Sequence, residues 1–382
     1  MANTLKFGAS EWYGSEGNIL AYNDTNNNFK PLPFDFSRGS IATVINKQGL
    51  IETVQANNAR VDYLDNAKGA LLLEPQRTNF FTYSEDFENY FNISEITLNS
   101  NYAISPDGTL NANKVTFPST SNSMYKSGLS LSGTHTISFW YKGEGSNIGK
   151  TFNVRLFSSA AEQNIKVTLE SGWKRFESQN NGLQTFEITN RNTTTIGTGS
   201  LLLYGFQIEQ GSFATSLIKT QGTAQTRLVD NCKIVNSPIL QATNQFTLFF
   251  DSKDFVNYGA TFANIRITLG AGEGPYDAGT GIHIHNTTWY YFNGSSALAL
   301  GTCYNAITDR KFAISYNGSK YTTYSNGVKI TETVCSASMV NWDTLTQGSL
   351  SYNGVDRIFN ISDLKLYNTA LTDEQLVALT TI

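Results

Sequence analysis

The stretch THTISFWY, residues 134–141, alternates along its length, with Ile137, Phe139 and Tyr141 sharing one side of an extended chain. Successive side chains of a β-strand point to opposite faces, so this period of two predicts a strand with one face in a core. TFNVRLF at residues 151–157 repeats the pattern, and LLLYGFQI at residues 201–208 suits a buried strand. Turn residues recur between such stretches, which is typical of an antiparallel sandwich.

A second set of strands follows in the C-terminal part. RKFAISYNGSKYTTYSNGVKITE, residues 310–332, predicts a three-strand meander, because Asn317-Gly318 and Asn326-Gly327 suit type I′ hairpin turns. Further on, Thr372-Asp373-Glu374-Gln375 fits a capping box and predicts one short helix that ends with the chain.

The first 80 residues differ from the rest. Pro31 and Pro33 interrupt any regular ladder, and short strands are expected at 41–45, 50–54, 60–64 and 70–73. The predicted fold is therefore all-β: two antiparallel jelly-roll sandwiches in series after an irregular N-terminal hairpin segment, with one short C-terminal helix. The expected domains are residues 1–80, the first sandwich at 81–235 and the second at 236–382.

Composition excludes several classes of protein. The chain has 382 residues and a formal net charge of -4, without a run of Lys or Arg, so nucleic acid is not an expected partner. No stretch approaches the roughly 20 apolar residues of a membrane helix. The N-terminal residues contain no apolar leader, which predicts synthesis in a cytoplasm without secretion. Cys232, Cys303 and Cys335 have no metal-site spacing and are expected to be buried thiols.

Two blocks resemble known families. Residues 36–40 (FSRGS), 49–52 (GLIE), 60–63 (RVDY), 73–79 (LEPQRTN) and 83–87 (YSEDF) resemble a segment of many tailed-bacteriophage virion proteins. There the segment precedes a jelly-roll domain that is similar to carbohydrate-binding modules, and residues 203–216 resemble the closing strand of that domain. Residues 361–372 resemble the last strand of a concanavalin A-like, laminin-G-like domain.

The resemblance implies a structural virion protein, a head or tail fibre or another appendage, that presents lectin-like domains to host-surface glycan. The N-terminal segment would dock to other virion proteins, and a homotrimer is favoured because several weak sugar contacts add avidity. Such a protein would assemble in the host cytoplasm, without membrane insertion, and become part of the virion. The alternatives are a capsid decoration protein without host contact and a glycan depolymerase. The family supplies no catalytic residues, so we expect no enzyme.

An aromatic group in the second sandwich is the candidate glycan site. Its residues are Tyr276, Asp277, Asn286, Trp289 and Tyr290. Rings stack on apolar sugar faces while Asp and Asn accept hydrogen bonds from hydroxyls. The alternative is that one face of the strand at 288–292 belongs to the core, since alternation separates Trp289 from Tyr290.

His283 and His285 are the candidate metal ligands, because residues two apart on a strand share a face. Repeated around a threefold axis, they would offer six nitrogens to a divalent cation; otherwise no cofactor is expected. The alternative is a polar sandwich face with neutral histidines. Acids are also grouped at Glu85, Asp86 and Glu88, a spacing that ordinary turns produce as well.

Arg38, Arg60 and Arg77 of the N-terminal block are interpreted as structural. Their guanidinium groups can join hairpin carbonyls to acids such as Glu52 and Glu74. The alternative is that they are ordinary surface arginines.

Overall fold

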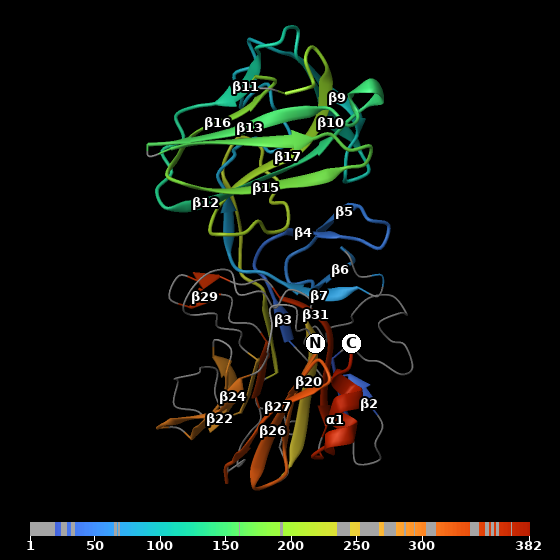
Figure 1. Ribbon diagram of the computed structural model, residues 1–382, viewed down its shortest axis with the longest axis vertical. Coiled ribbons are helices and arrows are strands. Elements are labelled where there is room, and N and C mark those ends of the chain that lie inside the picture. Colours follow the sequence, from blue (N-terminus) through green and yellow to red (C-terminus); the bar gives the residue numbers. More distant parts are fainter. Residues whose placement is uncertain are drawn as a thin grey trace.

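The structure of this chain is a computed structural model. It describes residues 20–23, 29–31, 35–64, 67, 69–159, 161–191, 194–234, 245–252, 267–270, 280–285, 288–293, 295–302, 311–336, 344–347, 351–352, 355–356, 359–367 and 369–382. These residues form two β-sandwiches with the hairpins of the N-terminal block between them (Figure 1). The predicted all-β fold with one short α-helix is confirmed.

The first sandwich consists of two antiparallel sheets. One contains, in spatial order, β15 (Lys174–Asn181), β12 (Thr134–Lys142), β17 (Ser200–Gln210), β10 (Leu110–Thr116) and β9 (Thr97–Ile104). The other contains β11 (Ser123–Lys126), β16 (Leu183–Thr189), β13 (Thr151–Ser158) and β14 (Glu162–Thr168). The apolar faces of both sheets enclose one core, and a 3-10 turn at Gly145–Asn147 follows β12.

The alternation at residues 134–141 places Ile137 and Phe139 in that core. Phe139 stacks between Phe176 and Phe206, with ring centroids 4.8 Å from each. Burial of large aromatic rings contributes much of the hydrophobic stabilisation of such a core.

The second sandwich also has two sheets. The first runs β2 (Phe29–Pro31), β1 (Leu20–Asn23), β31 (Phe359–Tyr367), β20 (Phe246–Ser252), β25 (Lys311–Tyr316), β26 (Lys320–Ser325) and β27 (Val328–Val334). The second runs β24 (Ala297–Thr302), β23 (Thr288–Asn293), β22 (Thr280–His285), β21 (Ile267–Gly270), β28 (Thr344–Gln347), β19 (Asn231–Ile234) and β3 (Asp35–Ser37). A separate two-strand pair is β29 (Ser351–Tyr352) with β30 (Val355–Asp356).

The meander predicted at residues 310–332 is β25–β26–β27, and Asn326 and Gly327 both adopt positive φ. At Asn317-Gly318 only the glycine has positive φ, so the type I′ prediction is wrong for this turn. α1 (Asp373–Thr380) has the predicted capping box: the Gln375 amide donates to the Thr372 hydroxyl, and the Thr372 amide donates to Gln375 Oε1. Leu376 packs against Phe249 and Tyr324 and so holds the helix on the sheet. Among the described residues, no helix is long and apolar enough to cross a membrane.

The first 80 residues contribute strands to the second sandwich. β7 (Ala70–Leu73) pairs antiparallel with residues 359–361 of β31, and β6 (Arg60–Asp62) pairs with β7. β1 pairs parallel with residues 364–366, and β3 pairs with β19 of the opposite sheet. The first sandwich therefore interrupts a body made from both ends of the chain.

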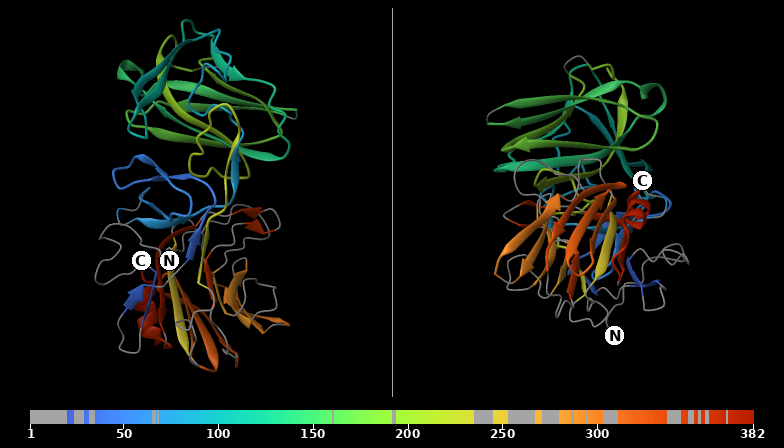
Figure 2. Two further views of the ribbon diagram at one scale, coloured as in Figure 1. Left: turned by 180° about the vertical axis from the view of Figure 1, so that it is seen from behind. Right: turned by 60° about the horizontal axis from the view of Figure 1, so that its bottom comes forward.

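The two chain segments that connect the first sandwich to the rest of the protein lie side by side. β8 (Arg77–Asn79) leads in, β18 (Gln225–Arg227) leads out, and the two pair antiparallel, as Figure 2 shows from behind. The hairpin of β4 (Ala42–Ile45) and β5 (Ile51–Val54) lies beside these two connecting strands. Ile51 of the hairpin packs with Trp140 and Tyr204 on the outer face of the first sandwich.

Candidate functional site

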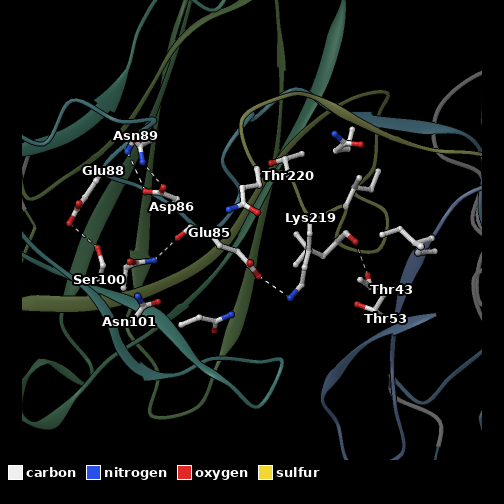
Figure 3. Close-up of a pocket in the computed structure, with 18 of the residues that line it drawn as sticks. Thr43, Thr53, Glu85, Asp86, Glu88, Asn89, Ser100, Asn101, Lys219 and Thr220 are labelled. Atoms are coloured by element: carbon white, nitrogen blue, oxygen red, sulfur yellow. Dashed lines mark hydrogen bonds and ion pairs between the residues drawn. The ribbon is translucent and has the colours of Figure 1, made fainter. Parts of the chain in front are cut away.

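A cleft of about 740 Å³ lies where the hairpin β4–β5 meets the first sandwich (Figure 3). Apolar side chains from Ile41, Ala42, Leu217 and Ile218 contribute to its lining beside many polar ones, and we call it the polar cleft. One wall comes from residues 85–89, β9 and β10, and the other from β4, β5 and the returning segment 217–226. Its lining is rich in side-chain amides, from Asn89, Asn101, Asn111, Asn113, Gln221 and Gln225. Carboxylates come from Glu85, Asp86 and Glu88, hydroxyls from Thr43, Thr53, Ser100, Thr220 and Thr226, and an amine from Lys219.

The acidic wall has a clear local origin. Phe87 and Phe91 are buried in the core, where each ring lies about 5 Å from Phe206. The backbone amide of Phe91 donates to the Phe87 carbonyl and closes a turn. With both rings held inward, the polar residues around Phe87 face the cleft. The sequence SEDFENYF therefore encodes an anchored loop with a polar outer side.

The floor of the cleft is an ion-pair network. Lys219 Nζ lies 3.0 Å from Glu85 Oε1 and 2.7 Å from Asp107 Oδ2. The Tyr204 hydroxyl donates to the same two carboxylates, at 2.5 Å and 2.9 Å. Burial opposes ionisation of Asp107, but hydrogen bonds from Lys219, Thr109 and Ser105 outweigh it and hold the pKa of Asp107 below its usual range.

These contacts engage both floor carboxylates. Burial and the negative charge of Glu85 raise the pKa of Tyr204, so its hydroxyl remains a donor. Burial opposes protonation of Lys219, but the hydrogen bonds and negative charges of Asp107 and Glu85 together outweigh it and raise the pKa of Lys219. Lys219 therefore stays protonated, and its single positive charge only partly offsets the two carboxylates of the floor.

The rim and the amide wall are partly bonded within the protein. Asn89 Nδ2 donates to Asp86, and the Ser100 hydroxyl donates to Glu88. Asn113 Nδ2 donates to the Glu85 carbonyl at 3.0 Å. Asn111 Nδ2 donates to Asp107, whereas Asn111 Oδ1 is buried and has no hydrogen-bond partner among the described residues.

A buried ionic cluster supports the wall formed by β4. Arg60 bonds Glu74 and Asp230 at once, and Arg38 Nη1 lies 3.0 Å from Asp230 Oδ1. Arg227 reaches Glu74 at 3.0 Å. Burial alone would raise the pKa of Glu74, but Arg227 and Arg60 lower it to about 2. The cluster joins the N-terminal block to the strand that returns from the first sandwich.

The structural interpretation of the arginines is confirmed for two of them. Arg38 donates to the carbonyls of Ser40, Gln55 and Asn58, and Arg60 donates to the carbonyl of Thr43. Arg77 lies over the ring of Phe213, 4.9 Å from its centroid. Of the two acids named with them, Glu74 is in the cluster, whereas Glu52 is exposed and accepts from Asn46.

The glycan group predicted in the second sandwich is not brought together by the described residues. Trp289 is completely buried and packs against Phe250, so its ring offers no face to a sugar. The exposed platform predicted there is therefore wrong for Trp289, because the alternation of β23 turns this residue into the core. Tyr290, on the opposite face, is half-buried. Tyr276, Asp277 and Asn286 lie outside the described residues.

The histidine pair falls on β22, where His283 pairs with Tyr290 and His285 with Thr288. Their side chains lie outside the described part, so a metal role stays a prediction. Elsewhere in the described ranges, no three His, Cys, Asp or Glu side chains gather in a way that could hold a metal ion.

Sequence reasoning noted Glu85, Asp86 and Glu88 only as a turn, and it missed the rest of the cleft. Lys219, Asn111 and Asn113 are far from that turn along the chain. Nothing in their local sequence distinguishes them from ordinary surface residues. The close spacing of the three acids was the only available signal.

No protein-family model matches the chain, and no curated protein matches it. Among solved structures, it is similar to the enzymatically active domain of tailspike protein 4 of bacteriophage CBA120. That match has 10% identity and a TM-score of 0.25, and it covers 37% of this chain and only 21% of the tailspike chain.

Two matches are carbohydrate-binding modules. The C-terminal CBM6 of the laminarinase LamC from Zobellia galactanivorans matches with 12% identity and a TM-score of 0.23, over 35% of this chain and 97% of that one. The CBM22 tandem of Xyn10C from Paenibacillus barcinonensis matches with 11% identity and a TM-score of 0.26, over 77% and 97%. Scores this low do not establish a shared function, so the residues of the cleft have to carry the functional assignment.

Proposed function

We propose that this chain is a non-enzymatic adhesive component of a phage particle, in a head or tail appendage, and that it binds host-surface glycan in the polar cleft. The observation that carries the proposal is the lining of amides, hydroxyls and carboxylates on a rigid sandwich edge. Such groups hydrogen-bond the many hydroxyls of a saccharide, and fixed side chains lose little entropy on binding. The virion context rests on the resemblance of residues 36–87.

Binding without hydrolysis is supported by the floor of the cleft. Hydrolysis of a glycosidic bond needs a carboxyl group to give a proton and a second one to act as base or nucleophile. Glu85 and Asp107 instead share Lys219 and the Tyr204 hydroxyl. Both are engaged in holding the wall, and the low pKa of Asp107 makes it a poor proton donor.

We further propose that several copies act together in the virion, with a homotrimer favoured, because single polar clefts bind sugars weakly and linked copies gain avidity. Docking to other virion proteins through the N-terminal block is part of the same proposal. β6 and β7 lie in the second sandwich, so the docking surface would be the outside of that body.

The test is calorimetric titration of the purified chain with surface polysaccharide from the host. The double variant Asn111→Ala/Gln221→Ala removes two cleft amides and should weaken binding about thirtyfold, since each neutral hydrogen bond contributes about 1 kcal/mol. The control is Asn164→Ala, an exposed amide of β14 outside the cleft, which should bind like the wild type.

Equal affinity of the double variant and the wild type would refute the cleft as the binding site. A fall in the viscosity of the polysaccharide would instead favour the depolymerase alternative. Particles that carry the double variant and adsorb normally would favour the capsid-decoration alternative.

A further inference from the structure

We infer that the cleft selects glycans that carry protonated amino groups and rejects glycans that carry carboxylate or sulfate. This inference rests on the proposed function and names the ligand class of the same cleft. It follows from the charges on the lining and from which of its hydrogen-bonding groups are already used.

The charge of the cleft is negative. Glu85 is balanced by Lys219, which is the only amine or guanidinium among the described residues of the lining. Lys219 also forms an ion pair with Asp107. Asp86 and Glu88 are exposed and form no ion pair within the described part of the chain. Their negative charges therefore act on whatever enters the cleft.

Several donors of the lining are used within the protein. The hydroxyls of Thr43 and Thr220 donate to the carbonyls of Leu217 and Phe81. Ser100 donates to Glu88, and Asn113 Nδ2 donates to the Glu85 carbonyl. These groups are not directed at a bound ligand.

Several hydrogen-bond acceptors of the lining remain available to a ligand. A carboxylate offers about four acceptor positions and no donor. Asp86 and Glu88 each use only part of this capacity on Asn89 and Ser100.

A ligand that satisfies this lining must be rich in donors. Sugar hydroxyls meet the requirement, and an ammonium group meets it better, because it brings three donors and a positive charge. A carboxylate on the sugar brings only acceptors and would face Asp86 and Glu88 as a like charge. The expected order of affinity is glucosamine oligomer, then neutral oligomer, then uronate oligomer.

The experiment compares tetramers of glucosamine, N-acetylglucosamine, glucose and galacturonic acid by calorimetry with the full chain. The buffer has low salt and a pH of about 6, below the usual pKa range of an amine such as the α-amino group. The glucosamine tetramer should bind about tenfold more tightly than its N-acetylated form, as expected for two partly exposed charge contacts. Added salt at about 1 M should remove most of this difference, because such contacts are screened.

The double variant Asp86→Asn/Glu88→Gln keeps the shape of both side chains and should reduce the tenfold preference to about twofold or less. The matched control, Glu162→Gln/Glu170→Gln, removes two exposed carboxylates outside the cleft and should keep the preference. Circular dichroism confirms that each variant is folded.

The outcomes separate the two levels of the proposal. Binding of neutral tetramers with equal or tighter binding of the galacturonate tetramer overturns the charge selection and leaves glycan binding in place. A preference that survives in the cleft double variant also overturns it. Failure of every tetramer and of the host polysaccharide to bind overturns the glycan function itself.

Discussion

At the scale of single residues, Asp62 is a carboxylate in an unfavourable place. It is 5% exposed and accepts a hydrogen bond from the Ile45 amide at 3.1 Å. Burial raises its pKa from 3.8 to about 6, although the Ile45 amide and Arg60 oppose the rise. The nearby charge of Glu74 adds to it. Asp62 therefore opposes folding when it is ionised.

The sign of its pH dependence follows from linkage. Between about pH 4 and pH 6 the folded chain keeps a proton on Asp62 that the unfolded chain has lost. The stabilising contribution of protonated Asp62 to the free energy of unfolding is thus fully present well below pH 4 and is lost as the pH rises through 6. Asp62→Asn keeps the acceptor for Ile45 and removes the titration. Relative to the wild type, the free energy of unfolding of the variant should rise by about 2.4 kcal/mol between pH 4 and pH 7.

Urea unfolding at both pH values measures this difference. Glu74 titrates lower and is present in both proteins, so its contribution cancels in the comparison. A constant difference between Asp62→Asn and the wild type across the range would contradict the prediction.

At the scale of elements, β17 contains a β-bulge at the place where the first sandwich contacts the β4–β5 hairpin. The pairing of β12 with β17 shifts register between Ser138 and Trp140. Gly205 stands at this shift with φ of +65°, and an added Cβ would lie 3.0 Å from the ring of Trp140. The bulge brings Trp140 and Tyr204 together under Ile51 of β5.

Gly205→Ala should therefore lower the free energy of unfolding of the first sandwich by at least about 2 kcal/mol, through left-handed strain and crowding against Trp140. Gly172→Ala is the matched control, since Gly172 has an ordinary φ and no atom within 4 Å of an added Cβ. Thermal unfolding followed by calorimetry compares the two. Equal transition temperatures for both variants would show that the bulge does not need glycine.

The elements also show what local sequence can predict. Period-two alternation located β12 and β13, and the Asn-Gly pairs located the turns of the β25–β27 meander, because these signals lie within one or two turns of chain. The capping box located α1 for the same reason. The burial of Trp289 was not predictable, since alternation defines two faces of β23 without saying which one meets Phe250.

At the scale of the whole molecule, pairings between distant segments organise the chain. Leu71 of β7 pairs with Ile361 of β31, and Lys219 meets Glu85 across the cleft. Neither pairing has a local signal, so the sequence predicted the hairpins of the N-terminal block and not their sheet. The cleft depends on the same arrangement, because one of its walls is the β4–β5 hairpin.

The arrangement predicts unequal behaviour of fragments. The core of the first sandwich is formed by residues between Phe80 and Ile208, so a fragment of residues 77–227 should be monomeric and unfold cooperatively. A fragment of residues 228–382 lacks β1, β3 and β7 and exposes an edge of β31, so it should aggregate. Gel filtration measures the oligomeric state of each fragment, and the dispersion of amide chemical shifts in NMR spectra shows whether it is folded. A well-folded, monomeric 228–382 fragment would contradict the prediction, and rescue by coexpressed residues 1–80 would support it.

The shared sheet has a consequence for the order of events on the ribosome. β7, with its buried run Ala70–Leu73, is synthesised early, but its partner β31 emerges only near the end of translation. At ordinary elongation rates this delay is on the order of tens of seconds. During that time the first sandwich can fold and β6 can pair with β7, while the apolar edge of β7 that pairs with β31 has no partner. The nascent chain is therefore most vulnerable to aggregation before its last strand appears, and a chaperone that covers β7 would act in this interval.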